Sequence, residues 1–218
     1  MNALMSFHAD LFFCPKGMTN YTRLFITSVK CTLHHVSLYS RLKLGYYPDL
    51  HWTSRKLTPT MDNPGTSTPA QSVAETLITT RRSILLIGSP MCTAFSRLQE
   101  VNYAKMDPAE VERRLAHGRR HLEWTVHLYR LQMAMGLYFL HEHPDGASSW
   151  NEPGMAYLAN SSGVHRVTGD MCRWGMTQYD DNGPGLIKKP TGFLTNAVEI
   201  AETLNKRCCG GHRHIPLL

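Results

Sequence analysis

The chain is poor in charged residues and has no long apolar run. Asp, Glu, Lys and Arg make up 18% of its 218 residues, and 42% are apolar, as in a globular protein. No stretch of about 18 consecutive apolar residues occurs, which argues against a membrane-spanning helix. The first residues also lack the basic and then apolar pattern of a secretory signal. We therefore expect a protein of the nucleus or cytoplasm that does not associate with a membrane.

Cysteine is too sparse for a disulfide scaffold. The six cysteines are scattered through the chain, and without a secretory signal they indicate reduced thiols. The formal net charge of +6 suits an acidic partner such as DNA. A generic basic surface explains the same charge equally well.

The composition divides the chain near residue 80. Residues 57–73 are rich in Pro, Thr, Ser and Gly, which is typical of a linker or an exposed loop. Before them only short apolar runs occur, and the chain has no internal repeats. We expect a poorly defined N-terminal region over residues 1–80 and one α/β domain over residues 81–214.

A strand, a helix and a second strand are predicted at the start of this domain. Apolar runs over 84–87 and 137–140 flank a helical pattern over 107–135. Asp107 can cap that helix, and Gly136 is placed to end it. This order favours a right-handed crossover between parallel strands. The fold class expected is therefore α/β, with a partial Rossmann-like, mostly parallel sheet and crossover helices.

Each of the two strands is followed by a chemically useful side chain. Cys92 comes shortly after the first strand, and Glu142 comes directly after the second. Because the carboxyl ends of parallel strands share one edge, where such sheets bind ligands, we expect both to face one pocket. A thiol and a carboxyl group there are a candidate nucleophile and acid.

Downstream of Pro144 the sequence predicts shorter elements. They are a helix over 152–159, a strand over 164–168, a loop over 180–185, a strand over 192–195, and a helix capped by Asn196 that runs to Leu204.

Four segments in order resemble motifs of the DNA cytosine-5 methyltransferases, in particular those of phages and mobile elements. The resemblance covers about residues 83–214. The segments are Gly88-Ser89-Pro90-Met91-Cys92-Thr93-Ala94-Phe95-Ser96, similar to Gly-x-Pro-Pro-Cys-x-x-Phe-Ser; Glu142-His143-Pro144, similar to Glu-Asn-Pro; Cys172-Arg173-Trp174-Gly175; and Lys189-Pro190-Thr191 with Thr195-Asn196.

The resemblance implies methyl transfer from S-adenosylmethionine to cytosine in DNA. In the family a cysteine thiolate adds to C6 of a cytosine turned out of the duplex, and a glutamate contacts N3. Carried over by motif, Cys92 is the nucleophile and Glu142 the cytosine-binding acid. Pro90, Ser96 and Arg173 are then expected to contact the substrate. Gly88 and Asn196 are expected to contact the cofactor.

The chain departs from the family in several places. Met91 stands where a second proline is usual, and His143 stands where asparagine is usual. Before Ser83 no strand followed by a glycine-rich turn is visible for the cofactor. Two interpretations follow: a fragmentary or diverged enzyme whose missing cofactor half a partner chain supplies, or an inactive remnant that binds nucleic acid weakly.

The C-terminus gathers residues that can ligate a metal ion. They are Cys208, Cys209, His212 and His214. Four ligands within seven residues are cramped, so a full site needs help from elsewhere in the chain. We expect no zinc site from these four residues alone.

Overall fold

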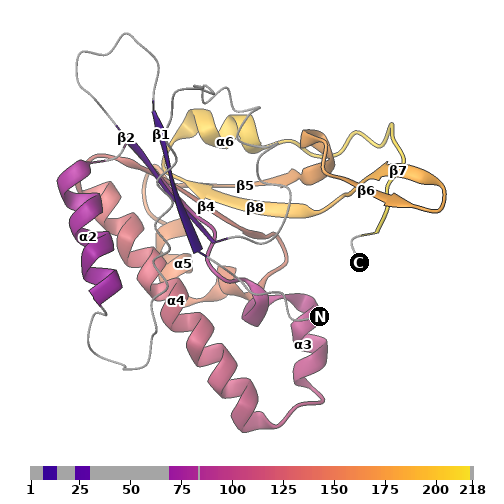
Figure 1. The fold of residues 1–218 in the computed structure, drawn as a ribbon, viewed down its shortest axis with the longest axis horizontal. Helices are drawn as coiled ribbons and strands as arrows, with labels where there is room; N and C mark the ends of the chain where they lie inside the picture. The colour runs from indigo at the N-terminus through magenta and orange to yellow at the C-terminus, as the bar shows by residue number, and fades with distance from the viewer. Residues whose placement is uncertain (1–6, 14–22, 30–68, 83, 217–218) are drawn as a thin grey trace.

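The computed structural model describes residues 7–13, 23–29, 69–82 and 84–216. A six-stranded sheet of order β1-β2-β3-β4-β8-β5 organises the fold, and a hairpin of β6 and β7 projects from one end (Figure 1). The strands are β1 (Phe7–Phe13), β2 (Arg23–Val29), β3 (Leu85–Gly88), β4 (Tyr138–Pro144), β5 (His165–Asp170), β6 (Thr177–Asp180), β7 (Gly183–Leu186) and β8 (Pro190–Thr195). The helices are α2 (Pro69–Arg81), α3 (Arg97–Tyr103), α4 (Pro108–Ala134), α5 (Pro153–Ala159) and α6 (Val198–Leu204), with 3-10 turns η1 (Thr93–Phe95), η2 (Ser148–Asn151) and η3 (Met171–Trp174).

The predicted strand–helix–strand unit is confirmed. β3 and β4 pair in parallel, with Leu86 opposite Phe139, and α4 connects them. Asp107 caps α4 by accepting a hydrogen bond from the Ala109 N–H at 3.0 Å. Gly136 follows the helix with a φ of 69°, a conformation that favours glycine.

The sheet is mixed, whereas a mostly parallel sheet was expected. β8 pairs antiparallel with both β4 and β5, and β1 pairs antiparallel with β2. The chain reaches β8 from β5 through η3 and the β6–β7 hairpin, without the crossover helix that a parallel pairing needs. β5 nevertheless runs in the same direction as β4, because both oppose β8. β2, β3, β4 and β5 therefore share one direction.

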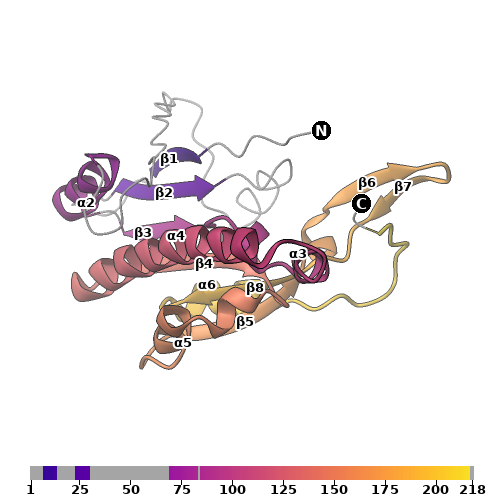
Figure 2. The same ribbon diagram turned by 90° about the horizontal axis from the view of Figure 1, so that it is seen from below.

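Helices cover the sheet on both faces, and successive strand residues enter different cores. Leu86 and Phe139 pack with Tyr129 of α4 in one cluster. Leu85, Ile87 and Leu140 pack in the other with Leu204 of α6. Figures 1 and 2 show α6 on one face of β8 and β5 and α4 with α5 on the other. The burial of β3 on both faces agrees with its lack of alternation.

Three predicted elements differ in detail. β4 extends to Pro144, because β8 continues the ladder along its far half. The loop expected over 180–185 is mostly strand, because Asp180 and residues 183–185 pair in the β6–β7 hairpin and only Asp181 and Asn182 form its turn. Ala197, not Asn196, stands at the cap position of α6, because the Asn196 side chain binds the backbone of β4 instead.

Part of the N-terminal region belongs to the same sheet. β2 pairs in parallel with β3, and α2 begins at Pro69, inside the segment expected to be a linker. The rest of residues 1–68 lies outside the described residues. Among the described helices, none is long and apolar enough to cross a membrane.

Candidate functional site at the carboxyl edge of the sheet

The loop after β3 is joined to the end of β4 by a buried hydrogen bond. The Ser89 hydroxyl donates to Oε2 of Glu142 at 2.6 Å, and the Glu142 residue is only 7% exposed. Lys189, just before β8, places its ammonium nitrogen 3.9 Å from Oε1 of the same carboxylate. Glu142 lies within β4, opposite Phe193, and not beyond the strand as the sequence predicted. A carboxylate with a hydroxyl and a cation beside it can bind a polar ring and exchange a proton with it.

His143 makes a second connection between the same two segments. One ring nitrogen, Nε2, lies 2.9 Å from the Pro90 carbonyl oxygen, and the other, Nδ1, lies 2.7 Å from the Ser149 hydroxyl. Burial lowers the pKa of His143, although the Glu142 carboxylate and the Pro90 carbonyl oppose that shift. A neutral imidazole that donates to Pro90 therefore fixes the loop against β4.

Cys92 lies two residues beyond Pro90, at the start of η1. Its carbonyl accepts a hydrogen bond from the Phe95 N–H at 3.0 Å, and its residue is partly exposed. Phe95 and Ala94 anchor the turn by packing against α4. Gly118 permits this packing, since a Cβ there would lie 2.8 Å from the Ala94 Cβ. The nucleophile candidate thus lies on a turn fixed by buried neighbours.

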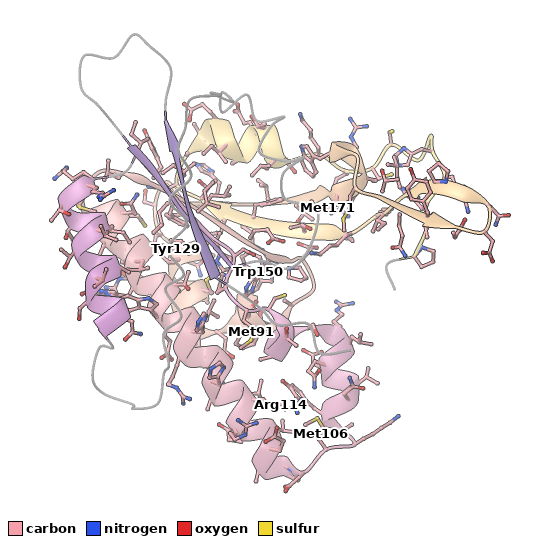
Figure 3. The ribbon with its side chains drawn as sticks, viewed as in Figure 1. Met91, Met106, Arg114, Tyr129, Trp150 and Met171 are labelled. Atoms are coloured by element: carbon pink, nitrogen blue, oxygen red, sulfur yellow. The ribbon has the colours of Figure 1, made fainter. Side chains whose placement is uncertain are left out.

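A cavity of about 260 Å³ borders this turn. It lies between η1, α3 and the first half of α4, with Met91 and Arg114 among its lining residues (Figure 3). Arg113 and Arg114 both bind Glu110, at 2.6 and 2.7 Å. These arginines therefore form part of an ion-pair network on α4, which agrees with a solvated face.

Gly88 is explained by the packing of Tyr129. The Tyr129 hydroxyl donates to the Gly88 carbonyl at 3.1 Å and lies 3.1 Å from Nδ1 of His141. A Cβ at Gly88 would lie 2.1 Å from that hydroxyl oxygen. The packing of Tyr129 thus explains why position 88 is a glycine, without the cofactor contact that the resemblance implied.

The other predicted site residues lie apart from Glu142. Ser96 caps α3, accepting from the Gln99 N–H at 3.2 Å. Asn196 lies at the amino end of β4, where it accepts from Phe139 N–H at 2.9 Å and donates to the Leu137 carbonyl at 3.0 Å. Arg173 is exposed and donates to the sulfur of Cys209 at 3.2 Å. The structure therefore gathers Pro90 and Glu142 with the loop of Cys92, and places Asn196 at the opposite edge.

The C-terminal cysteines and histidines form a cluster of different membership from the one predicted. Cys172 of η3 joins Cys208, His212 and His214, whereas Cys209 lies outside. Burial, followed by the neighbouring Cys208, raises the pKa of the Cys172 thiol to about 11. Cys172 is thus a poor candidate for a nucleophile.

Ser89 and Lys189 are the site residues that sequence reasoning missed. Ser89 occupies an unspecified position of the cysteine motif, and Lys189 belongs to a motif far along the chain. Their contacts with Glu142 depend on the pairing of β8 with β4, which no local pattern in the sequence reveals.

Comparison with known proteins identifies no relative of the chain. Neither protein-family models nor curated proteins nor solved structures yield a match for the chain.

Proposed function

We propose that residues 83–214 form the catalytic half of a domain similar to the DNA cytosine-5 methyltransferases. The hydrogen bond between Ser89 and Glu142 carries this proposal, because it joins the loop of the candidate nucleophile to the candidate acid. The second link, from His143 to Pro90, holds the same two segments together. DNA is the partner, and the site of action is the nucleus or cytoplasm, where thiols stay reduced.

The chemistry follows from the reactivity of cytosine. The Cys92 thiolate forms a bond to C6, the ring electrons move toward N3, and Glu142 donates a proton to N3. C5 thereby becomes the nucleophilic carbon of an enamine and can take up an electrophile. Loss of the C5 hydrogen as a proton, departure of the thiolate and return of the N3 proton to Glu142 restore the ring. A base stacked in a duplex cannot reach Cys92, so the cytosine must first turn out.

The fold supports a site at this place. Four strands of the sheet run in one direction, and helices cover both faces. In open α/β sheets, ligands bind at the carboxyl ends of the strands. Ser89 follows β3 directly, and Glu142 lies in the last part of β4. A partial Rossmann-like sheet, interrupted by β8, is therefore the fold that we propose for this half.

The sequence that follows β2 does not fit S-adenosylmethionine. The family resemblance implies a glycine-rich turn after a strand, but residues 30–44, which follow β2, contain no glycine. We propose that a partner chain supplies the cofactor-binding half, so the test below needs no methyl donor.

Exchange of the C5 hydrogen of cytosine tests the addition step. When the thiolate adds to C6, C5 can take a proton from water and lose its original hydrogen, so tritium at C5 passes into solvent. We expect Cys92→Ser to abolish the release of tritium from labelled duplex DNA. Glu142→Gln, which keeps the size but not the proton, should slow it by about 100-fold or more.

Cys209→Ser is the matched control, since Cys209 is an exposed cysteine of the tail. It should exchange at the wild-type rate. Exchange by the Cys92→Ser variant, or none by the folded wild-type chain, contradicts the proposed addition.

The misfit with the cofactor favours a second candidate, an inactive remnant that binds nucleic acid. The net charge of +6 would then supply a weak, sequence-independent affinity. DNA binding that falls steeply with salt, together with no tritium release, would select this function over the first.

A further inference from the structure

We propose that Cys172, Cys208, His212 and His214 bind a zinc ion that fastens the C-terminal tail to the end of β5. Each residue offers one ligand atom, and these four atoms all lie within 4.8 Å of one another. The inference is independent of the proposed function, since it uses none of the same residues.

The separations suit a tetrahedral zinc centre. Zinc lies about 2.3 Å from a cysteine sulfur and about 2.0–2.1 Å from a histidine nitrogen, which puts sulfur and nitrogen about 3.5 Å apart. The Cys208 sulfur lies 3.5 Å from Nε2 of His212 and 3.4 Å from Nε2 of His214. The ligand atoms thus surround a volume of the size that the ion needs.

Backbone contacts hold the two cysteines where a metal ion would need them. The Cys208 N–H donates to Oδ2 of Asp170 at 2.7 Å, and Asp170 ends β5 just before η3, which carries Cys172. The Gly210 N–H donates to the Cys208 sulfur at 3.3 Å, and Gly210 adopts a φ of 79°. An N–H directed at sulfur stabilises a thiolate, as the surroundings of metal ligands commonly do.

The two histidines are set by the pairing of the tail with β7. His214 forms a parallel bridge with Leu186, and the Leu186 N–H donates to the Arg213 carbonyl at 3.0 Å. Arg213, between the two histidines, extends instead to Asp180 of β6 at 2.5 Å. Figures 1 and 2 show the tail passing beside the β6–β7 hairpin. Because the side chains of successive residues alternate in direction here, His212 and His214 both lie on the side of Cys208, and Arg213 lies on the other side.

The ligand set favours zinc in a structural role. Two thiolates and two imidazoles suit zinc, whereas calcium and magnesium need oxygen ligands. Four protein ligands fill a tetrahedral centre and leave no position for a substrate. Cys209 is exposed and receives a hydrogen bond from Arg173, outside the cluster. It therefore provides a control cysteine next to a proposed ligand.

Metal analysis of the purified full-length chain, followed by replacement of zinc with cobalt, tests the site. We expect about one zinc ion per chain. The cobalt form should show the intense visible absorption of a tetrahedral centre and a thiolate-to-cobalt charge-transfer band. Cys172→Ser and His212→Ala should lose most of both signals, while Cys209→Ser should keep them.

Cobalt titration of the wild-type chain keeps the test decisive if the ligand variants fail to fold. A folded wild-type chain without zinc and without the tetrahedral cobalt spectrum overturns the proposal. Equal metal loss in Cys209→Ser and Cys172→Ser overturns this ligand set, and so does a disulfide between Cys172 and Cys208 in the freshly purified chain.

Discussion

Tyr129 of α4 lies in close contact with Gly88 at the end of β3. Tyr129 is fully buried, stacks on Phe139 with ring centroids 4.6 Å apart, and brings its hydroxyl onto the backbone of Gly88. His141, also fully buried, lies beside that hydroxyl, and burial lowers its pKa well below the ordinary value. The start of the Ser89–Cys92 loop therefore depends on contacts beneath the sheet.

Gly88→Ala should destabilise the fold by about 1–3 kcal/mol or more, because the added methyl group overlaps the Tyr129 hydroxyl. Tyr129→Phe removes that oxygen and should relieve part of the overlap. Urea unfolding of wild type, both single variants and the double variant measures the coupling between the two positions. Strictly additive free energies would show that Tyr129 and Gly88 do not meet in this way.

At the scale of elements, α3 links the candidate site to α4. This helix has seven residues and none of them is buried, so its start depends strongly on its cap. Ser96 provides that cap, although the sequence motif suggested a substrate contact for it. The two roles can be separated by experiment.

Ser96→Ala should lower the free energy of unfolding by about 1 kcal/mol, because the Gln99 N–H loses its acceptor. Ser96→Asp should recover most of that loss, since aspartate is an equally good cap. Chemical denaturation measures both, and tritium exchange of the same variants reports on the substrate. If Ser96→Asp restores stability but not exchange, Ser96 contacts the substrate as well.

The sequence predicts helices and strands whose ends carry clear capping or turn residues, but it does not predict which strands pair with one another. Asp107, Pro108 and Gly136 mark the ends of α4 in the sequence, and the helix begins and ends beside them. The position of β8 between β4 and β5 depends on pairing between residues far apart in the chain. That pairing placed Lys189 at Glu142 and Asn196 at the other edge, where motif order alone suggested a cofactor contact.

For the whole molecule, the two sites lie along consecutive strand ends of one sheet. Glu142 lies two residues before the end of β4, Lys189 precedes β8, and Asp170 ends β5 before the η3 turn of Cys172. The Met171 N–H donates to the Lys189 carbonyl at 3.0 Å, which connects η3 to the residue beside Glu142. The tail cluster and the residues around Glu142 are thus connected through the backbone. Cys172 lies 36 residues before Cys208, so the short spacing of the C-terminal ligands did not reveal it as a member of the cluster.

Covalent trapping by DNA tests whether Cys92 is the nucleophile. A duplex carrying 2-pyrimidinone in place of one cytosine presents a more electrophilic C6, because the ring lacks the electron-donating 4-amino group. We expect a protein–DNA adduct that survives denaturing electrophoresis, with mass spectrometry locating the bond at Cys92. An adduct at another cysteine, or none from the folded chain, would contradict the assignment of Cys92 as the nucleophile.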